Sequence, residues 1–161
     1  MYLDALEFLE EEHDAWVPFE ALVDLPDAAL ERPVEGAHGW SGRDLMAHML
    51  SGQAVSLDIA RELAVGEESP TAARRDHEWE TRGGDAVNAE IQADWAAIPL
   101  DELRAKFLSL PGELRGTLTV VPEARWIKHP THMQSFDGET IEHYREHLAD
   151  LEAILAAAAD A

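Results

Sequence analysis

Apolar residues recur at three- and four-residue intervals along most of this 161-residue chain, and this periodicity constrains the fold more than any other feature. Alanine, leucine and glutamate dominate the sequence, while runs of β-branched residues are nearly absent. Residues 117–121 resemble a strand, but one five-residue strand has no partner with which to form a sheet. We therefore predict an all-α fold, and the length suits a single domain that spans residues 1–161.

The periodicity predicts four helical segments, at residues 3–23, 41–66, 85–114 and 135–159, with a kink or end at Pro18 in the first and a break at Pro99 in the third. The second has the clearest boundaries, because Ser41 can cap its first turn, Asp44 completes a box-like start, and Gly66 follows its end. Two polar segments, 67–85 and 120–136, are expected to be long irregular connections, and the first of them is expected to be mobile or functional. Together these elements indicate an antiparallel helical bundle with long connections.

Acidic residues outnumber basic ones by 33 to 12, which gives a formal net charge of −21. A field of that sign repels phosphate backbones and anionic membrane surfaces, so we expect no nucleic-acid partner and no membrane partner. High acidity with only Lys106 and Lys128 as lysines suits either a protein kept soluble in high salt or an ordinary acidic protein. The N-terminal residues lack the basic and apolar pattern of a secretory signal, so we expect a cytoplasmic location.

The charge imbalance also predicts how stability responds to salt. Added salt screens the repulsion among like charges, so the melting temperature should rise as NaCl increases from a low concentration to about 1 M. Thermal unfolding followed by circular dichroism across a salt series measures this response. A melting temperature that stays flat or falls with added salt would contradict the expectation.

Three of the eight histidines occur where the helical pattern turns side chains inward. His143 and His147 are four residues apart, which places them on one helix face with Cβ atoms about 5–6 Å apart. His48 lies within the apolar stripe of the predicted helix 41–66. Three imidazoles from two helices can bind one divalent metal ion and leave a position open for water or substrate, which is the ligand count of a catalytic metal site.

The ligand chemistry limits the choice of metal. The chain has no cysteine, so thiolate metal sites and disulfides are excluded. Imidazole ligands suit Zn, Ni, Fe and Cu, of which we favour Zn or Ni. A lone histidine on an apolar stripe is more often a hydrogen-bonded core residue, and this alternative applies to each of the three.

A shared site also makes a prediction about helix direction. His48 and His143 each lie about two turns into their predicted helices. If both helices start at the same level, the histidines meet only when the helices are parallel neighbours. A parallel pair needs a long crossover connection, which the polar segment 67–85 can help to provide.

Two segments resemble motifs of a known family. Residues 40–50 read WSGRDLMAHML and resemble the start of the second helix in the DinB-like four-helix-bundle superfamily. Residues 143–151 read HYREHLADL and resemble the last-helix motif of the same superfamily. The resemblance implies a four-helix bundle in which His48, His143 and His147 take the places of the three metal ligands, and it suggests a homodimer.

The superfamily includes thiol-dependent transferases and is related to the N-terminal domain of mycothiol-dependent maleylpyruvate isomerase. In the isomerase branch the middle ligand is typically a glutamate, so His143 in that place favours the general DinB-like branch. The resemblance implies a metal-dependent transferase that acts on a small-molecule substrate with an external low-molecular-weight thiol, because this chain has no cysteine. A metal-dependent hydrolase of a small substrate and a non-catalytic metal- or ligand-binding protein are the alternatives.

Other side chains are weaker candidates. His13 lies on the apolar stripe of the first predicted helix, where it would either line the same cavity or pack as a core residue. Trp79, in the polar connection, is a candidate cover for a pocket mouth. Arg74 and Arg75, in so acidic a chain, would either bind an anionic substrate or offset neighbouring acids.

Overall fold

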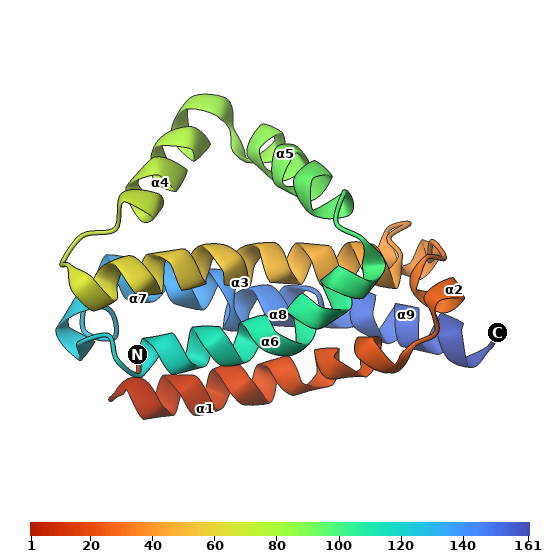
Figure 1. Ribbon diagram of the computed structural model, residues 1–161, viewed down its shortest axis with the longest axis horizontal. Coiled ribbons are helices and arrows are strands. Elements are labelled where there is room, and N and C mark those ends of the chain that lie inside the picture. Colours follow the sequence, from red (N-terminus) through yellow and green to blue (C-terminus); the bar gives the residue numbers. More distant parts are fainter.

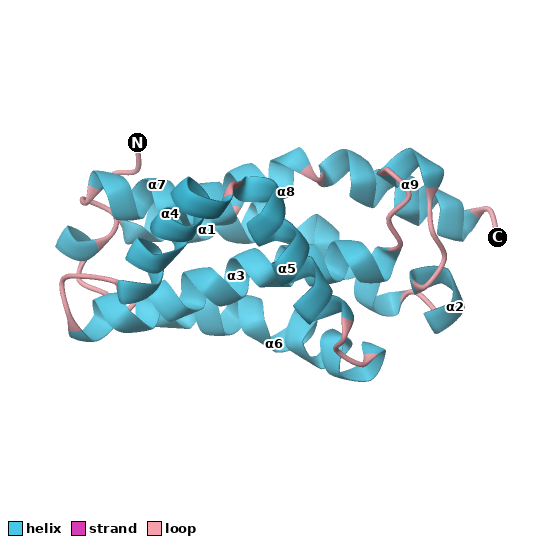
Figure 2. Ribbon diagram, turned by 90° about the horizontal axis from the view of Figure 1, so that it is seen from above, coloured by secondary structure: helices cyan, strands magenta, loops and turns pink.

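The computed structural model describes residues 1–161 and is helical throughout, with no strand, which confirms the all-α prediction. Four long segments lie lengthwise beside one another (Figure 1 and Figure 2): α1 (Ala5–Trp16), α3 (Gly42–Val65), α6 (Leu100–Leu118), and the consecutive α7 (Pro130–Glu139), α8 (Ile141–Glu146) and α9 (Leu148–Ala159). The shorter elements are η1 (Val17–Asp24), α2 (Asp27–Leu30), η2 (Glu35–Ala37), α4 (Pro70–Arg82), α5 (Gly84–Ala96) and η3 (Glu123–Arg125). None of these helices combines the length and the apolar character that a membrane crossing requires.

The four segments form two pairs of opposite direction. In Figure 1, α1 and the α7–α9 segment run from left to right, whereas α3 and α6 run from right to left. α3 and α6 are therefore parallel neighbours: Arg43, near the start of α3, donates to the Ile98 carbonyl just before α6. The hairpin of α4 and α5 arches from the end of α3 to the start of α6, and so supplies the crossover that a parallel pair needs (Figure 1).

The predicted parallel arrangement of the second and fourth helices is wrong. Gly42 lies against Ile154, and Gly52 lies against Glu139. Residue numbers in the α7–α9 segment therefore decrease as residue numbers in α3 increase, which means that the two segments are antiparallel. The prediction assumed that both helices start at the same level. In the structure α9 continues past the start of α3, where η2 covers it, and the middle of α7–α9 therefore faces the first turns of α3.

Two further expectations are corrected. The segment 67–85 is largely helical, because Ser69 caps α4 by accepting a hydrogen bond from the Ala72 N–H and Pro70 occupies the first helical position. The predicted helix 135–159 starts earlier, at Pro130, and its regular geometry is interrupted at Thr140 and again at His147. The second interruption coincides with one of the predicted metal ligands.

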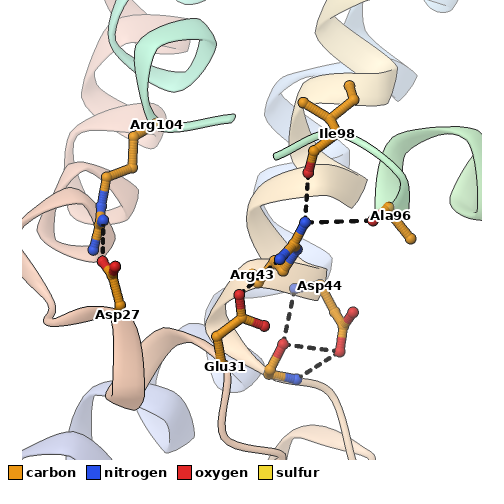
Figure 3. A network of polar contacts seen from close by, with 8 residues as sticks. Asp27, Glu31, Arg43, Asp44, Ala96, Ile98 and Arg104 are labelled. Atoms are coloured by element: carbon orange, nitrogen blue, oxygen red, sulfur yellow. Dashed lines mark hydrogen bonds and ion pairs between the residues drawn. The ribbon is translucent and has the colours of Figure 1, made fainter. Parts of the chain in front are cut away.

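Polar contacts hold the start of α3 in place (Figure 3). Ser41 accepts a hydrogen bond from the Asp44 N–H, and the Asp44 carboxylate accepts one from the Ser41 N–H, which is the capping box that the sequence indicated. Arg43 donates to Glu31 at 2.7 Å and to the Ile98 carbonyl. These bonds tie the start of α3 to the end of the α4–α5 hairpin and so set the position of the first turns of α3.

A buried polar network joins the four long segments inside an otherwise apolar core. Glu12 of α1 has a side chain only 1% exposed. Its carboxylate accepts hydrogen bonds from Arg115 of α6 at 3.0 Å and from the Tyr144 hydroxyl of α8 at 2.9 Å. Gln53 of α3 donates to the same hydroxyl at 2.8 Å. The network adjoins the predicted metal ligands in the chain, because Tyr144 directly follows His143.

Candidate metal centre

The imidazoles of His48, His143 and His147 converge on one point. His48 comes from the second turn of α3, His143 from α8, and His147 from the junction of α8 and α9. The His48 Nε2 lies 2.8 Å from the His143 Nε2 and 3.1 Å from the His147 Nε2. The three ligand atoms all lie within 4.8 Å of one another, so the structure brings together the three residues that the sequence predicted as ligands.

The spacing and the protonation of these nitrogens fit a bound cation. Two imidazole nitrogens that bind one tetrahedral ion at 2.0–2.1 Å lie about 3.3 Å apart, close to the two distances observed. His147 donates its Nδ1 proton to Asp150 at 2.8 Å, which leaves a lone pair on its Nε2. The His48 Nε2 lies within hydrogen-bond distance of two nitrogens, but its single proton or single lone pair satisfies only one of them. A divalent cation bound at this point could instead accept a lone pair from each of the three rings.

Two groups outside the triad orient it. The Trp40 ring stacks on His147 with ring centroids 5.6 Å apart, and it meets the edge of His48 at 4.9 Å. The buried Asp150 binds His147 through one carboxylate oxygen and the exposed His38 through the other, at 2.9 Å. Neither Trp40 nor Asp150 was predicted from the sequence as a site residue. The three-residue spacing between His147 and Asp150 was the sequence signal that could have identified Asp150.

Substitution of Asp150 tests this orienting role. Asp150→Asn keeps the size of the side chain but removes the charge that fixes the His147 tautomer, so Zn²⁺ affinity should fall about 10–100-fold. Competition titration against a chromogenic chelator measures the affinity. His38→Ala removes the exposed partner of the same carboxylate and should change the affinity by less than about threefold. Equal effects of the two substitutions would rule out the orienting role of Asp150.

A cavity of about 310 Å³ adjoins the three histidines. α3, α7 and α8 line one side of it, and α4 and α5 line the other, so the crossover hairpin covers the site (Figure 1). The residues that line it are Ser51, Gly52, Arg75, Trp79, Asn88, Ile91, Gly138, Glu139 and Glu146, together with the three histidines. Two weaker candidates, Trp79 and Arg75, therefore lie at the site. His13 does not, because its side chain is exposed on α1 and the cavity does not include it.

Burial lowers the pKa of two of the imidazoles. The pKa of His48 falls to about 4, first because of burial and then because of the neighbouring His147. The pKa of His143 falls to about 3, because of burial and then because of His48 and His147. Both rings are neutral at pH 7, so their nitrogen lone pairs are available to a metal without competition from protons.

These shifts predict the acid sensitivity of the metal-free protein. The two histidines have pKa values near 6.5 when unfolded and lower values when folded, so the unfolded state binds more protons. The free energy of unfolding contributed by the two neutral histidines is fully present above pH 6.5, and it is lost as the pH falls towards the folded-state pKa values of about 4 and about 3. Each histidine lowers the free energy of unfolding by at most about 1.4 kcal/mol for each pH unit of this fall.

Urea unfolding of chelator-treated protein at pH 7.5 and at pH 5.5 measures this slope. The double variant His48→Gln/His143→Gln is the control, because it keeps the other titratable groups. The variant should lose less stability than the wild type over this interval. A wild-type protein that is equally stable at both pH values would contradict the expectation.

Comparisons of the chain with models of protein families, with curated proteins and with solved structures give no match. The case for a metal centre therefore rests on the geometry of the site. Three imidazole nitrogens face one point beside a cavity, and a buried carboxylate accepts a hydrogen bond from the other ring nitrogen of His147.

Proposed function

We propose that this protein is a DinB-like four-helix-bundle enzyme that binds a divalent metal, Zn or Ni, and transfers a group between a small-molecule substrate and an external thiol. The observation that carries the proposal is the convergence of three imidazole nitrogens beside a cavity of about 310 Å³. Three protein ligands leave a coordination position for an exchangeable ligand. The adjoining cavity gives that position access to a small molecule.

The position of the motifs supports the DinB-like assignment. The segment 40–50 spans the cap and first turns of α3, and its histidine points towards the α7–α9 segment. The segment 143–151 spans the α8–α9 junction and supplies the other two ligands. Both motifs thus contribute to a single site, as the resemblance implies.

The groups at the site would divide the chemistry between a bound metal ion, its protein ligands and an external thiol. A bound divalent ion would supply a Lewis acid that lowers the pKa of a coordinated thiol or water. Three neutral imidazoles leave the positive charge of such an ion uncompensated, and Asp150 keeps His147 in the binding tautomer. The thiol must come from a separate molecule, because the chain has no cysteine. Residues of α4 and α5 form the wall of the cavity that faces the three histidines.

One observation favours hydrolysis as the second candidate. The Glu139 carboxylate lines the cavity, and burial raises its pKa against the opposing effect of Arg75. A carboxylate with a raised pKa suits a general base that takes a proton from water. Such a site would cleave a small substrate without any thiol.

An activity comparison separates these functions. Protein prepared without a histidine tag is loaded with Zn²⁺ or Ni²⁺ and tested with an activated aryl halide and a panel of low-molecular-weight thiols, and in parallel with a nitrophenyl ester alone. The proposal predicts conjugation that needs both metal and thiol and that His143→Ala abolishes. Metal-dependent ester cleavage without thiol would favour the hydrolase. Stoichiometric metal with neither activity would favour a non-catalytic metal-binding protein.

A further inference from the structure

Arg75 is the one lysine or arginine among the residues that line the metal cavity. It extends from α4 in the covering hairpin, and its side chain is only 20% exposed. Arginine accounts for most of the 12 basic residues in a chain of net charge −21, and many of those side chains pair with acids on the surface. A mostly buried guanidinium inside the cavity therefore needs a separate explanation.

Most N–H donors of the Arg75 guanidinium have no hydrogen-bond partner in the protein. The guanidinium makes one hydrogen bond, from its Nη2 to the Glu139 Oε1 at 3.2 Å. A guanidinium has five N–H donors in a planar fork that matches a carboxylate in bidentate geometry. Arg75 and Glu139 thus form a single-contact pair, and donors that could bind a second oxyanion remain free.

A second cavity, of about 270 Å³, adjoins the first through shared lining residues. Arg75, Trp79 and Glu139 line both cavities. The second cavity adds an apolar wall formed by Val55, Ile59 and Ala72, beside the polar Asp76 and Ser135. The ion pair therefore stands between the metal cavity and a pocket with one apolar wall, against which a hydrocarbon or aromatic group can pack.

We propose that Arg75 anchors the substrate and that this substrate is a small carboxylate with an apolar body. Its carboxylate takes the free donors of the Arg75 fork, its apolar body contacts Trp79 and the wall of the second cavity, and its reactive part lies in the metal cavity. The identification as a substrate rests on the proposed function. The binding of the carboxylate does not, because Arg75 is not a ligand of the metal.

The test is isothermal titration of the full chain with benzoate, with the neutral isostere benzamide and with inorganic phosphate, in about 0.15 M NaCl, where surface charges are screened beyond about 8 Å. Each titration is done on metal-free protein and on Zn²⁺-loaded protein. Benzoate should bind both forms at least about tenfold more tightly than benzamide or phosphate does. A protein that binds benzoate but no Zn²⁺ would overturn the proposed metal function while it supports the carboxylate site.

Variants at three positions sharpen the test. Arg75→Gln should weaken benzoate binding about tenfold or more, while Arg74→Gln removes the same charge from the adjacent exposed position and should leave binding unchanged. Glu139→Gln removes the competing carboxylate and should tighten benzoate binding, a gain that a loosened fold would not produce. The proposal is overturned if benzamide or phosphate binds as tightly as benzoate, if the two arginine variants behave alike, or if Glu139→Gln weakens binding or leaves it unchanged.

Discussion

Each of the single variants His48→Ala, His143→Ala and His147→Ala should lower the affinity for Zn²⁺ by more than about a hundredfold and leave the helices folded. The reason is that each ring supplies one of only three protein nitrogens at the site, and two rings cannot complete it. Loss of a ligand should exceed the 10–100-fold cost typical of a residue that only orients one. The three variants should behave alike, because the His48 Nε2 is in contact with both other nitrogens.

Metal content by mass spectrometry and competition titration on protein without a histidine tag measure this loss, and circular dichroism checks the fold. His13→Ala is the matched control, because His13 is exposed on α1 outside the cavity and its loss should leave the affinity unchanged. Near-normal affinity in His48→Ala would reduce the site to the His143/His147 pair and contradict a shared centre.

The largest loss of stability is expected from Arg115→Leu. Arg115 is the cationic partner of Glu12, whose side chain is 1% exposed in the core. Leucine in its place leaves the carboxylate buried with only the Tyr144 hydroxyl as a hydrogen-bond donor. Removal of one partner of a buried ion pair costs about 3–5 kcal/mol, because the remaining charge is uncompensated. Because the Arg115 side chain is 22% exposed, we expect the lower end of this range.

The adjacent residue provides a control for this prediction. Glu11 pairs with Arg145 at 2.7 Å, but the Arg145 side chain is 61% exposed. Arg145→Leu should therefore lower the free energy of unfolding by no more than about 1 kcal/mol. Glu12→Gln in the Arg115→Leu background removes the buried charge and should restore part of the stability. Urea unfolding of the four proteins tests the set, and an equal loss in the two leucine variants would contradict a special role for the buried pair.

Local sequence patterns were sufficient to predict the three candidate metal ligands and the start of α3. The four-residue spacing of His143 and His147 implies a shared helix face wherever the helix lies. The Ser41 and Asp44 cap marks the start of α3, and His48 follows it by two turns. These features depend on residues close in sequence, and for that reason they could be predicted without knowledge of the tertiary structure.

Relations between helices could not be obtained in the same way. The direction of α3 relative to α7–α9 depends on how far α9 extends beyond the start of α3, and no residue in either helix encodes that offset alone. α4 was missed because it is polar on nearly all sides, with Thr71 as its one buried residue, so it has no apolar stripe to reveal it.

The inward face of α1 was also misjudged. The predicted stripe included His13, whose side chain is exposed. The buried line is Phe8, Glu12 and Trp16, at four-residue spacing. An acid within a run of three glutamates looks like part of a solvated surface, and only the presence of Arg115 and Tyr144 on the facing helices makes its burial favourable.

X-ray absorption spectroscopy at the zinc edge of Zn²⁺-loaded, tag-free protein tests the central claim most directly. The account predicts one zinc ion per chain, with three imidazole nitrogens at about 2.0–2.1 Å and one further light ligand that does not come from an imidazole. Multiple scattering from the rings counts the imidazoles. A zinc ion bound by two imidazoles or fewer, or a stoichiometry far below one per chain, would contradict the account.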